Sequence, residues 1–129
     1  MISYSMNYDY IAGFIDGEGC IGVYKNRYHI IFQIQISNTN RLVLEEIDKF
    51  LILQGINGKV GLLHHKTDKW KEAYSYTISN RKDILWLLLN ISNRLVVKKS
   101  QAEYVLSNCS LSFGGNKNFN VDEFKSLRN

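Results

Sequence analysis

The sequence predicts one α+β domain, with helices on one face of an antiparallel sheet and the other face left open. Two observations lead to this fold class. Apolar residues switch repeatedly between helical spacing and strict alternation, which gives the order αββαββα followed by further helices. The chain has 129 residues and 45% hydrophobic content, enough to bury one core but hardly two. We therefore expect a single domain over residues 1–129, with a core over 7–110 and a helical tail over 111–129.

The first helix is expected to begin after Asn7, a residue type that caps helices well. Its apolar positions at helical spacing are Tyr8, Ile11, Ala12 and Ile15. Tyr10 and Phe14 add apolar surface on another side, so we expect this helix to be buried on more than one face.

From Gly19 the apolar period changes to two, which predicts two strands joined by a turn over residues 26–28. The residues expected to face the core on these strands are Ile21, Val23, Ile30, Phe32, Ile34 and Ile36. Amides stand between the apolar positions of the second strand, so the opposite face is polar. Two later strands enclose a charged hairpin tip over residues 64–71. Their alternating core positions are Val60, Leu62, Tyr74, Tyr76 and Ile78.

Between the two pairs of strands, a second helix is expected over about residues 40–54 and is stopped by Gly55. Its apolar stripe consists of Val43, Leu44, Ile47, Phe50 and Leu51. A third helix is expected over 81–91 and a fourth from about Lys98, followed by a flexible joint at 114–116. Asn120, with Glu123 three residues later, is typical of a capping box and predicts a short terminal helix.

The net charge of +4 is too small by itself to indicate a polyanionic partner, but its distribution is uneven. Residues 59–99 hold nine basic and three acidic residues, whereas residues 1–58 hold four basic and six acidic ones. Such a basic segment can attract phosphate, or it can be an ordinary solvated surface. Both interpretations stay open on charge alone.

Composition argues against several other classes of protein. No apolar stretch approaches the ~20 residues of a membrane span, and the N-terminus lacks the basic flank of a secretory signal, so we expect a soluble intracellular protein. Cys20 and Cys109 lack the spacing of a zinc site and are expected to be simple thiols. His64 and His65 are neighbours on a strand and cannot hold one ion together. Frequent Ile, Asn, Lys and Tyr suggest an AT-rich source, such as an organelle, a phage or a low-GC microbe.

The segment 11–19 carries the strongest functional signal. Gly13 and Gly17 lie four apart on one side of a helix, where they would let a second helix approach closely. A glycine inside a helix costs about 1 kcal/mol relative to alanine, so two in one short helix call for a packing reason. Glu18 stands at the negative end of the helix dipole, where a divalent cation bound by its carboxylate and a nearby carbonyl oxygen would offset the repulsion. The alternative is an ordinary glycine cap beside a solvated glutamate.

This segment resembles the motif of the LAGLIDADG homing endonucleases, with Tyr10 before it and a strand after it. Ile11 and Phe14 stand at the leucine positions of the motif, and Glu18 stands at its final acidic position. The order of elements is also that of the family, and the resemblance extends over roughly residues 8–106. It implies a site-specific endonuclease that cuts both strands of a long, nearly palindromic DNA duplex.

The chain contains one copy of the motif, so the resemblance implies a homodimer joined through the helix over residues 10–19. The two Glu18 side chains would then lie near the twofold axis. The interface residues implied in this way are Ile11, Ala12, Gly13, Asp16 and Gly17.

The catalytic set implied by the resemblance consists of Glu18, Asn38, Arg41 and Lys98. Glu18 and the carbonyl oxygen of Gly17 would hold the cofactor, Mg²⁺ or Mn²⁺, whereas Ca²⁺ could bind without supporting cleavage. The cation would polarise the scissile phosphate and activate water. The two basic residues of the set would add positive charge where negative charge grows.

Three of these assignments have a plain alternative. Asn38 would position metal-bound water in the family role, but from the residues alone it is also a natural helix cap. Arg41 would lie near the scissile phosphate, or it is a surface residue. Lys99 could take the place of Lys98 if the register differs by one residue.

The resemblance also implies that the open sheet face forms a saddle on DNA, because a two-stranded ribbon fits the major groove. The residues expected to face outward there are Gly22, Tyr24, Asn26, His29, Gln33, Gln35, Gly61, Leu63, His65, Ser75 and Thr77. The loop residues more suited to phosphates are Arg27, Lys66, Lys69 and Lys71.

Two other functions remain compatible with the sequence. The first is an intron maturase or another non-cleaving nucleic-acid-binding protein of the same fold. The second is a structural or interaction module whose basic surface binds nothing specific.

Overall fold

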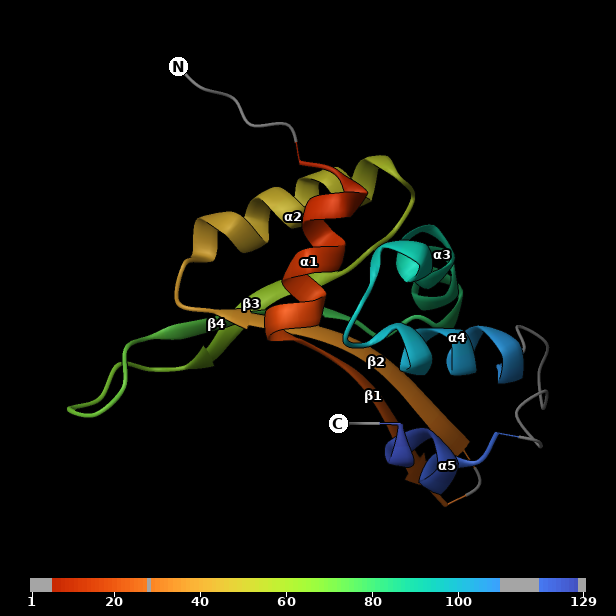
Figure 1. Ribbon diagram of the computed structural model, residues 1–129. Coiled ribbons are helices and arrows are strands. Elements are labelled where there is room, and N and C mark those ends of the chain that lie inside the picture. Colours follow the sequence, from red (N-terminus) through yellow and green to blue (C-terminus); the bar gives the residue numbers. More distant parts are fainter. Residues whose placement is uncertain (1–5, 28, 110–118, 128–129) are drawn as a thin grey trace.

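The computed structural model describes residues 6–27, 29–109 and 119–127. Its sheet contains β1 (Gly19–Asn26), β2 (His29–Asn38), β3 (Lys59–His64) and β4 (Ala73–Ile78). The strands lie in the order β1-β2-β4-β3, and all three pairings are antiparallel. Figure 1 shows the sheet arching beneath the helices, with the β1–β2 and β3–β4 hairpins descending at opposite ends. The α+β class expected from the two apolar periods is confirmed.

The helices are α1 (Tyr8–Glu18), α2 (Arg41–Leu53), α3 (Arg81–Ile91), α4 (Lys99–Asn108) and α5 (Val121–Ser126), with a 3₁₀ turn η1 (Ser92–Arg94) after α3. Each predicted helix is present, and α3 has the predicted bounds. Gly55, with φ 83°, ends the turn after α2. The expected joint at residues 114–116 lies outside the described residues. None of the helices in the described ranges is long and apolar enough to cross a membrane.

Asparagine side chains start four of these helices, each by accepting a hydrogen bond from the backbone amide three residues later. These caps are Asn7, Asn40, Asn80 and Asn120. The predicted capping box at α5 is formed only in part. Glu123 does not return to the Asn120 amide; instead the hydroxyl of Tyr104 accepts from that amide and donates to Glu123. The tail is therefore tied to α4, which a local sequence motif does not reveal.

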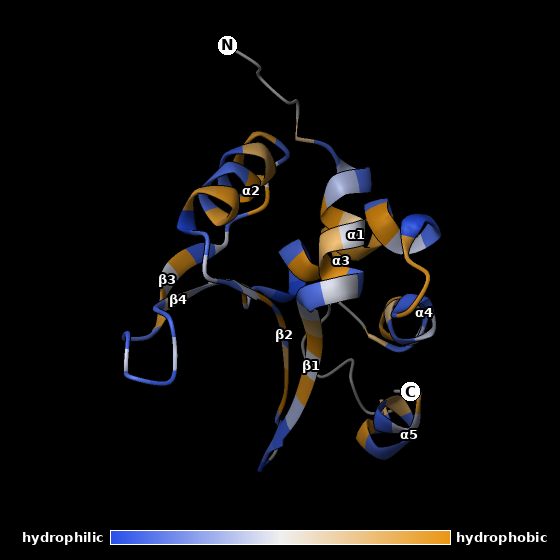
Figure 2. Cartoon of the chain, turned by 60° about the vertical axis from the view of Figure 1, so that its left-hand side comes forward, coloured by the Kyte–Doolittle hydropathy of each residue, from blue (hydrophilic) through white to orange (hydrophobic). Residues whose placement is uncertain are grey.

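The core lies between the sheet and the helices, and α1 stands at its centre. Figure 1 shows α1 between α2 and α3, and Figure 2 shows apolar and polar residues alternating along these helices. Ile11, Ala12 and Ile15 are fully buried there. Tyr8 packs edge-on against Phe50 of α2, with ring centroids 5.2 Å apart. The second apolar side of α1, expected to be buried as well, is not covered within the single chain, because Tyr10 on that side is 43% exposed.

Strand parity follows the sequence pattern closely in β1, β2 and β4. Ile21 pairs with Ile34, and Val23 with Phe32, all on the buried face. In β3 the register shifts between Leu62 and His64, which is a bulge. The alternation of inward and outward side chains that starts at Val60 therefore does not continue past Leu62.

Candidate functional site

The C-terminal end of α1 brings Glu18 next to the end of β2. Asn38 Nδ2 donates to Glu18 Oε2 at 2.7 Å, and Asn38 Oδ1 accepts from the Asn40 amide at 2.7 Å. The Asn38 amide is thereby held at both ends, with its N–H groups toward the carboxylate. Asn40, and not Asn38, caps α2. Asn38 therefore lies beside the acidic residue, and the residue that caps α2 is its neighbour Asn40.

Arg41 lies at the same edge of the sheet. Its guanidinium stands over the Tyr74 ring, 5.3 Å from the centroid, and Tyr74 is the register partner of Asn38. Arg41 Nε also pairs with Glu45 Oε1 at 3.0 Å on the surface of α2. The side chain is about half exposed, at 51%. An exposed pair of this kind contributes little stability and leaves Arg41 able to turn toward another anion.

Asp16 connects α1 to the segment that leads into α4. Its carboxylate accepts from the backbone amides of Val96, Val97 and Lys98, at 2.6, 3.2 and 3.0 Å. Partial burial tends to raise the pKa of Asp16, but these three donors and the charge of Lys98 outweigh it, so the pKa is lowered. The carboxylate is thus held in its charged form.

Lys98 reaches the same turn of α1 with its side chain. Its Nζ donates to the carbonyl oxygen of Asp16 at 2.8 Å. A cavity of about 240 Å³ lies beside it, with Gly19, Cys20 and Gln101 in its wall. Lys99 is exposed at the start of α4. Of the two lysines that the sequence left open, Lys98 is the one that extends to the end of the motif helix.

The exposed side of α1, which we call the glycine face, is lined by Tyr10, Gly13, Phe14 and Gly17. It borders a shallow hollow of about 460 Å³ that continues to Glu18. A Cβ atom added at Gly13 or Gly17 would meet nothing within 4 Å. The two glycines therefore serve no packing purpose inside the chain, and their surface is available to a second helix.

Two of the expected interface residues are covered by the chain itself, which corrects their assignment, and a third makes contacts within the chain. Ile11 and Ala12 are 0% exposed and belong to the core of the single chain, so they have no surface to offer a partner. The Asp16 carboxylate is occupied by the backbone of the segment before α4. The assignment was wrong for Ile11 and Ala12 because a helix with two apolar sides does not reveal which one faces inward.

The open face of the sheet carries the predicted row of polar side chains. Gln35 pairs with Cys20 and Thr77, and Thr77 pairs in turn with Lys59, so these residues form one line across all the strands. Ser37 and Ser75 form the next line with Gly61. The remaining outward candidates on β1 and β2 that are at least partly exposed are Tyr24, Asn26, His29 and Gln33.

Gly22 is a correction within this face. It lies on the outward side, but it is buried, and a Cβ atom built on it would lie 2.7 Å from the hydroxyl oxygen of Tyr24. The Tyr24 ring folds back across the glycine. Tyr24, which is 49% exposed, therefore presents the surface that was assigned to Gly22.

The two hairpin tips hold the basic loop residues, which are all exposed: Arg27, Lys66, Lys69 and Lys71. Leu63 and His65 are exposed as well, but the bulge after Leu62 removes the alternation on which their outward assignment depended. Trp70, 65% exposed, stands among the lysines, and sequence reasoning did not select it. A tryptophan within a charged loop is the signal that could have indicated it.

The protein-family model described as LAGLIDADG endonuclease matches residues 11–112. The chain belongs to the LAGLIDADG endonuclease family. The match begins at the first residue of the motif in α1 and covers the sheet, α2, α3 and α4. No curated protein matches the chain.

Solved structures of LAGLIDADG proteins share this fold. Two structures of the homing endonuclease I-CvuI match. The one in complex with the I-CreI target, with magnesium and uncleaved DNA, is 21% identical over 78% of this chain and 63% of that chain, with TM-score 0.61. The one in complex with its own target, with calcium, is 19% identical over 93% of this chain and 80% of that chain, with TM-score 0.67. An archaeal intron-encoded homing endonuclease, I-Vdi141I, complexed with DNA, is 23% identical over 95% of this chain and 84% of that chain, with TM-score 0.62. The LAGLIDADG meganuclease I-AabMI, bound to uncleaved DNA, is 22% identical over 96% of this chain but 45% of that chain, with TM-score 0.67. In the first and last of these comparisons, the chain spans less than two thirds of its counterpart.

The described residues offer only part of a cation site. Within the described ranges, no three His, Cys, Asp or Glu side chains come together in a way that could hold a metal ion. Glu18 supplies an exposed carboxylate, and oxygen is the ligand that magnesium prefers. The donor set therefore fits a divalent ion once a second carboxylate and phosphate oxygens are added.

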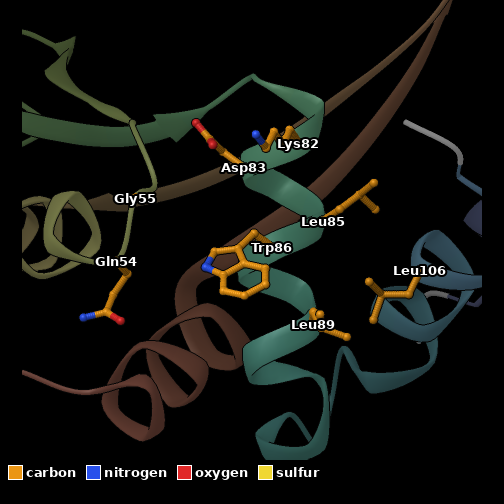
Figure 3. A pocket seen from close by; sticks show the side chains of 8 residues that line it. All are labelled: Gln54, Gly55, Lys82, Asp83, Leu85, Trp86, Leu89 and Leu106. Carbon is orange, nitrogen blue, oxygen red and sulfur yellow. The ribbon is translucent and has the colours of Figure 1, made fainter. Parts of the chain in front are cut away.

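A separate hollow lies on the helical side of the LAGLIDADG domain, away from the motif (Figure 3). It has a volume of about 410 Å³ and is mostly apolar; Leu85 and Leu89 of α3 lie on the side of Leu106 of α4, whereas Trp86 extends toward the side of Gln54. Trp86 is 49% exposed. None of the candidate site residues lines it.

Proposed function

We propose that this protein is a site-specific DNA endonuclease that acts as a homodimer and depends on a divalent cation. The observation that carries the proposal is the glycine face of α1, which is exposed along its length and ends at the Glu18 carboxylate. Two copies of this face, packed across a twofold axis, would bring one Glu18 from each chain into a shared site. The target would then be a long, nearly palindromic duplex.

The side chains around Glu18 would divide the work as follows. Glu18, with a backbone oxygen such as that of Gly17, would hold Mg²⁺ or Mn²⁺. The bound cation would supply a Lewis acid for the scissile phosphate. Asn38, which donates to the carboxylate at 2.7 Å, would fix the orientation of Glu18. Because its amide carries no charge, Asn38 could orient water but could not act as a base.

Lys98 and Arg41 would stabilise the transition state from two sides. One N–H of the Lys98 ammonium donates to the Asp16 carbonyl oxygen, which leaves two for a phosphate oxygen. Arg41 would exchange its exposed pairing with Glu45 for a phosphate of the substrate. Fixed positive groups of this kind act where negative charge develops on the phosphoryl oxygens.

The DNA would lie along the open sheet face. The polar lines across the sheet offer amide and hydroxyl groups to base edges, and glutamines such as Gln33 and Gln35 can pair with adenine in the major groove. The basic tips of the two hairpins would contact phosphates on either side. We further infer a single domain over the whole chain and an intracellular location, in an organelle or in a microbial or phage-infected cell.

The test uses target sites selected from a randomised duplex library by cleavage with the protein. Cleavage of a selected site should require magnesium. Glu18→Gln should abolish cutting while binding to the same duplex persists, because only the cation-binding carboxylate is lost. Glu103→Gln, an exposed change on α4, is the matched control and should cut normally. Binding by the unchanged protein with no cutting in magnesium or manganese would instead select a non-cleaving maturase-like function.

A further inference from the structure

Asp16 is bound to the segment that leads into α4. Its carboxylate and carbonyl oxygens accept all four hydrogen bonds that join the end of α1 to residues 96–98. Lys98 donates two of them, one from its backbone amide and one from Nζ. Asp16 thus holds both the backbone amide and the side-chain ammonium of Lys98.

The start of α4 explains why a carboxylate is needed there. Lys98 precedes the helix and offers no side-chain cap of its own. The three amides that Asp16 binds lie just before the positive end of the helix, and successive backbone N–H groups of this kind favour a negative group. Asp16 supplies that group from another helix, 80 residues earlier in the chain.

We propose that Asp16 is a positioning residue for Lys98 in the cleavage reaction, a role that rests on the function proposed above. Asp16 lies two residues before Glu18 on the same helix. A rigid turn of α1 therefore links the lysine to the carboxylate that would hold the cation. A flexible lysine side chain fixed at both ends needs little rearrangement when DNA arrives, which is how preorganisation accelerates a reaction.

Loss of the Asp16 carboxylate should lower the cleavage rate but leave the affinity for DNA nearly unchanged. Asp16→Asn retains the size of the side chain but loses the charge and one of the two acceptor oxygens. It should lower the single-turnover cleavage rate on the order of tenfold to a hundredfold, the scale of a 1 Å misplacement. Affinity for the same duplex should change less than about twofold, because the open sheet face is untouched. Asp122→Asn, the same change at an exposed carboxylate on α5, is the matched control and should retain the rate.

A double-mutant cycle distinguishes positioning from a purely structural role. If Asp16 acts through Lys98, then Asp16→Asn should not slow Lys98→Ala any further. Equal slowing in both backgrounds would overturn the proposal, as would a parallel loss of affinity. Thermal unfolding of each variant identifies the temperature range in which all are folded, and Asp16→Glu, which retains the charge, should recover part of the rate.

A measurement without DNA keeps this proposal separate from the proposed function. Amide hydrogen exchange at Val96, Val97 and Lys98 should accelerate in Asp16→Asn, while the amides of α4 itself stay protected. Unchanged exchange would overturn the positioning role even if the wild-type protein cuts DNA. Faster exchange in Asp16→Asn, together with a wild-type protein that cuts no DNA, would support the contact between Asp16 and residues 96–98 and refute the nuclease function.

Discussion

At the scale of single residues, Arg27 and Tyr76 both occupy positions where another residue type would be more stable. Arg27 has φ 51°, a left-handed conformation that disfavours any side chain with a Cβ atom. Tyr76 is fully buried, and its hydroxyl has no hydrogen-bond partner among the described residues. Such positions indicate that something other than stability selects the residue.

For Arg27 we predict opposite effects on stability and on DNA binding. Arg27→Gly should raise the free energy of unfolding by up to about 1 kcal/mol, because glycine adopts this conformation without strain. The same change should weaken DNA binding and reduce the salt dependence by about one phosphate contact. Arg27→Lys, which retains both the charge and the strain, should change neither quantity much. Denaturant unfolding and binding titrations at several salt concentrations provide the measurements, and unchanged binding by the glycine variant would contradict the prediction.

For Tyr76 the prediction concerns alkaline pH. Burial raises the pKa of Tyr76 well above its usual range, and the charges of Asp48 and Asp83 add to the effect. A raised pKa means that stability is complete below the unfolded value of about 10 and falls as the pH rises above it. Tyr76→Phe should therefore be as stable as the wild type or more so at pH 7, and it should lose less stability above about pH 10. Tyr24→Phe, at an exposed position, is the control; parallel wild-type and Tyr76→Phe curves across this range would show that the pKa of Tyr76 is not raised.

At the scale of elements, α1 has three sides with different functions. One side completes the core through Ile11 and Ile15, a second holds the start of α4 through Asp16, and the glycine face is exposed. Its sequence is therefore constrained by two sets of contacts inside the chain, and the third side is the part of α1 that would serve assembly.

Gly13→Val should convert the protein to a folded monomer. The added side chain meets nothing within 4 Å in the single chain, and valine is a better helix former than glycine, so folding should not suffer. Between two helices the same side chain would prevent close approach, and cleavage should be lost with the dimer. Sedimentation and circular dichroism measure the two properties. Gly61→Val, which also has open space at its Cβ, is the control for assembly; a Gly13→Val protein that remains dimeric would place the interface elsewhere.

At the scale of the whole molecule, the sheet separates two surfaces of different character. The open face and its hairpins carry polar and basic groups, whereas the helical side carries the apolar hollow around Trp86. The chain has two tryptophans, and each marks one of these regions: Trp70 the β3–β4 hairpin and Trp86 the helical side.

Fluorescence can therefore show which region DNA contacts. In Trp86→Phe the remaining emission comes from Trp70 and should change when duplex DNA binds, because that indole stands exposed among three lysines. In Trp70→Phe the emission of Trp86 should remain unchanged. The response should disappear at high salt, since phosphate contacts dominate binding. A response from Trp86 alone would assign DNA to the helical side.

The sequence by itself determined the elements, the parity of most strands and the motif. It did so because helical spacing, alternation and asparagine caps are local properties, as the bounds of α3 and the pairing of Ile21 with Ile34 illustrate. Local patterns, together with the family resemblance, selected Glu18 and Asn38. The structure brings these two side chains within hydrogen-bond distance.

Only the tertiary structure decided which side of α1 faces inward, what Asp16 binds and which lysine reaches the motif. Periodicity shows which residues share a side of a helix, but not which of two apolar sides the rest of the chain covers. The contacts of Asp16 join residues 80 to 82 positions apart, and no local pattern encodes that separation. The burial of Gly22 under Tyr24 and the bulge after Leu62 likewise depend on how neighbouring atoms fill space, which becomes definite only when the strands are packed together.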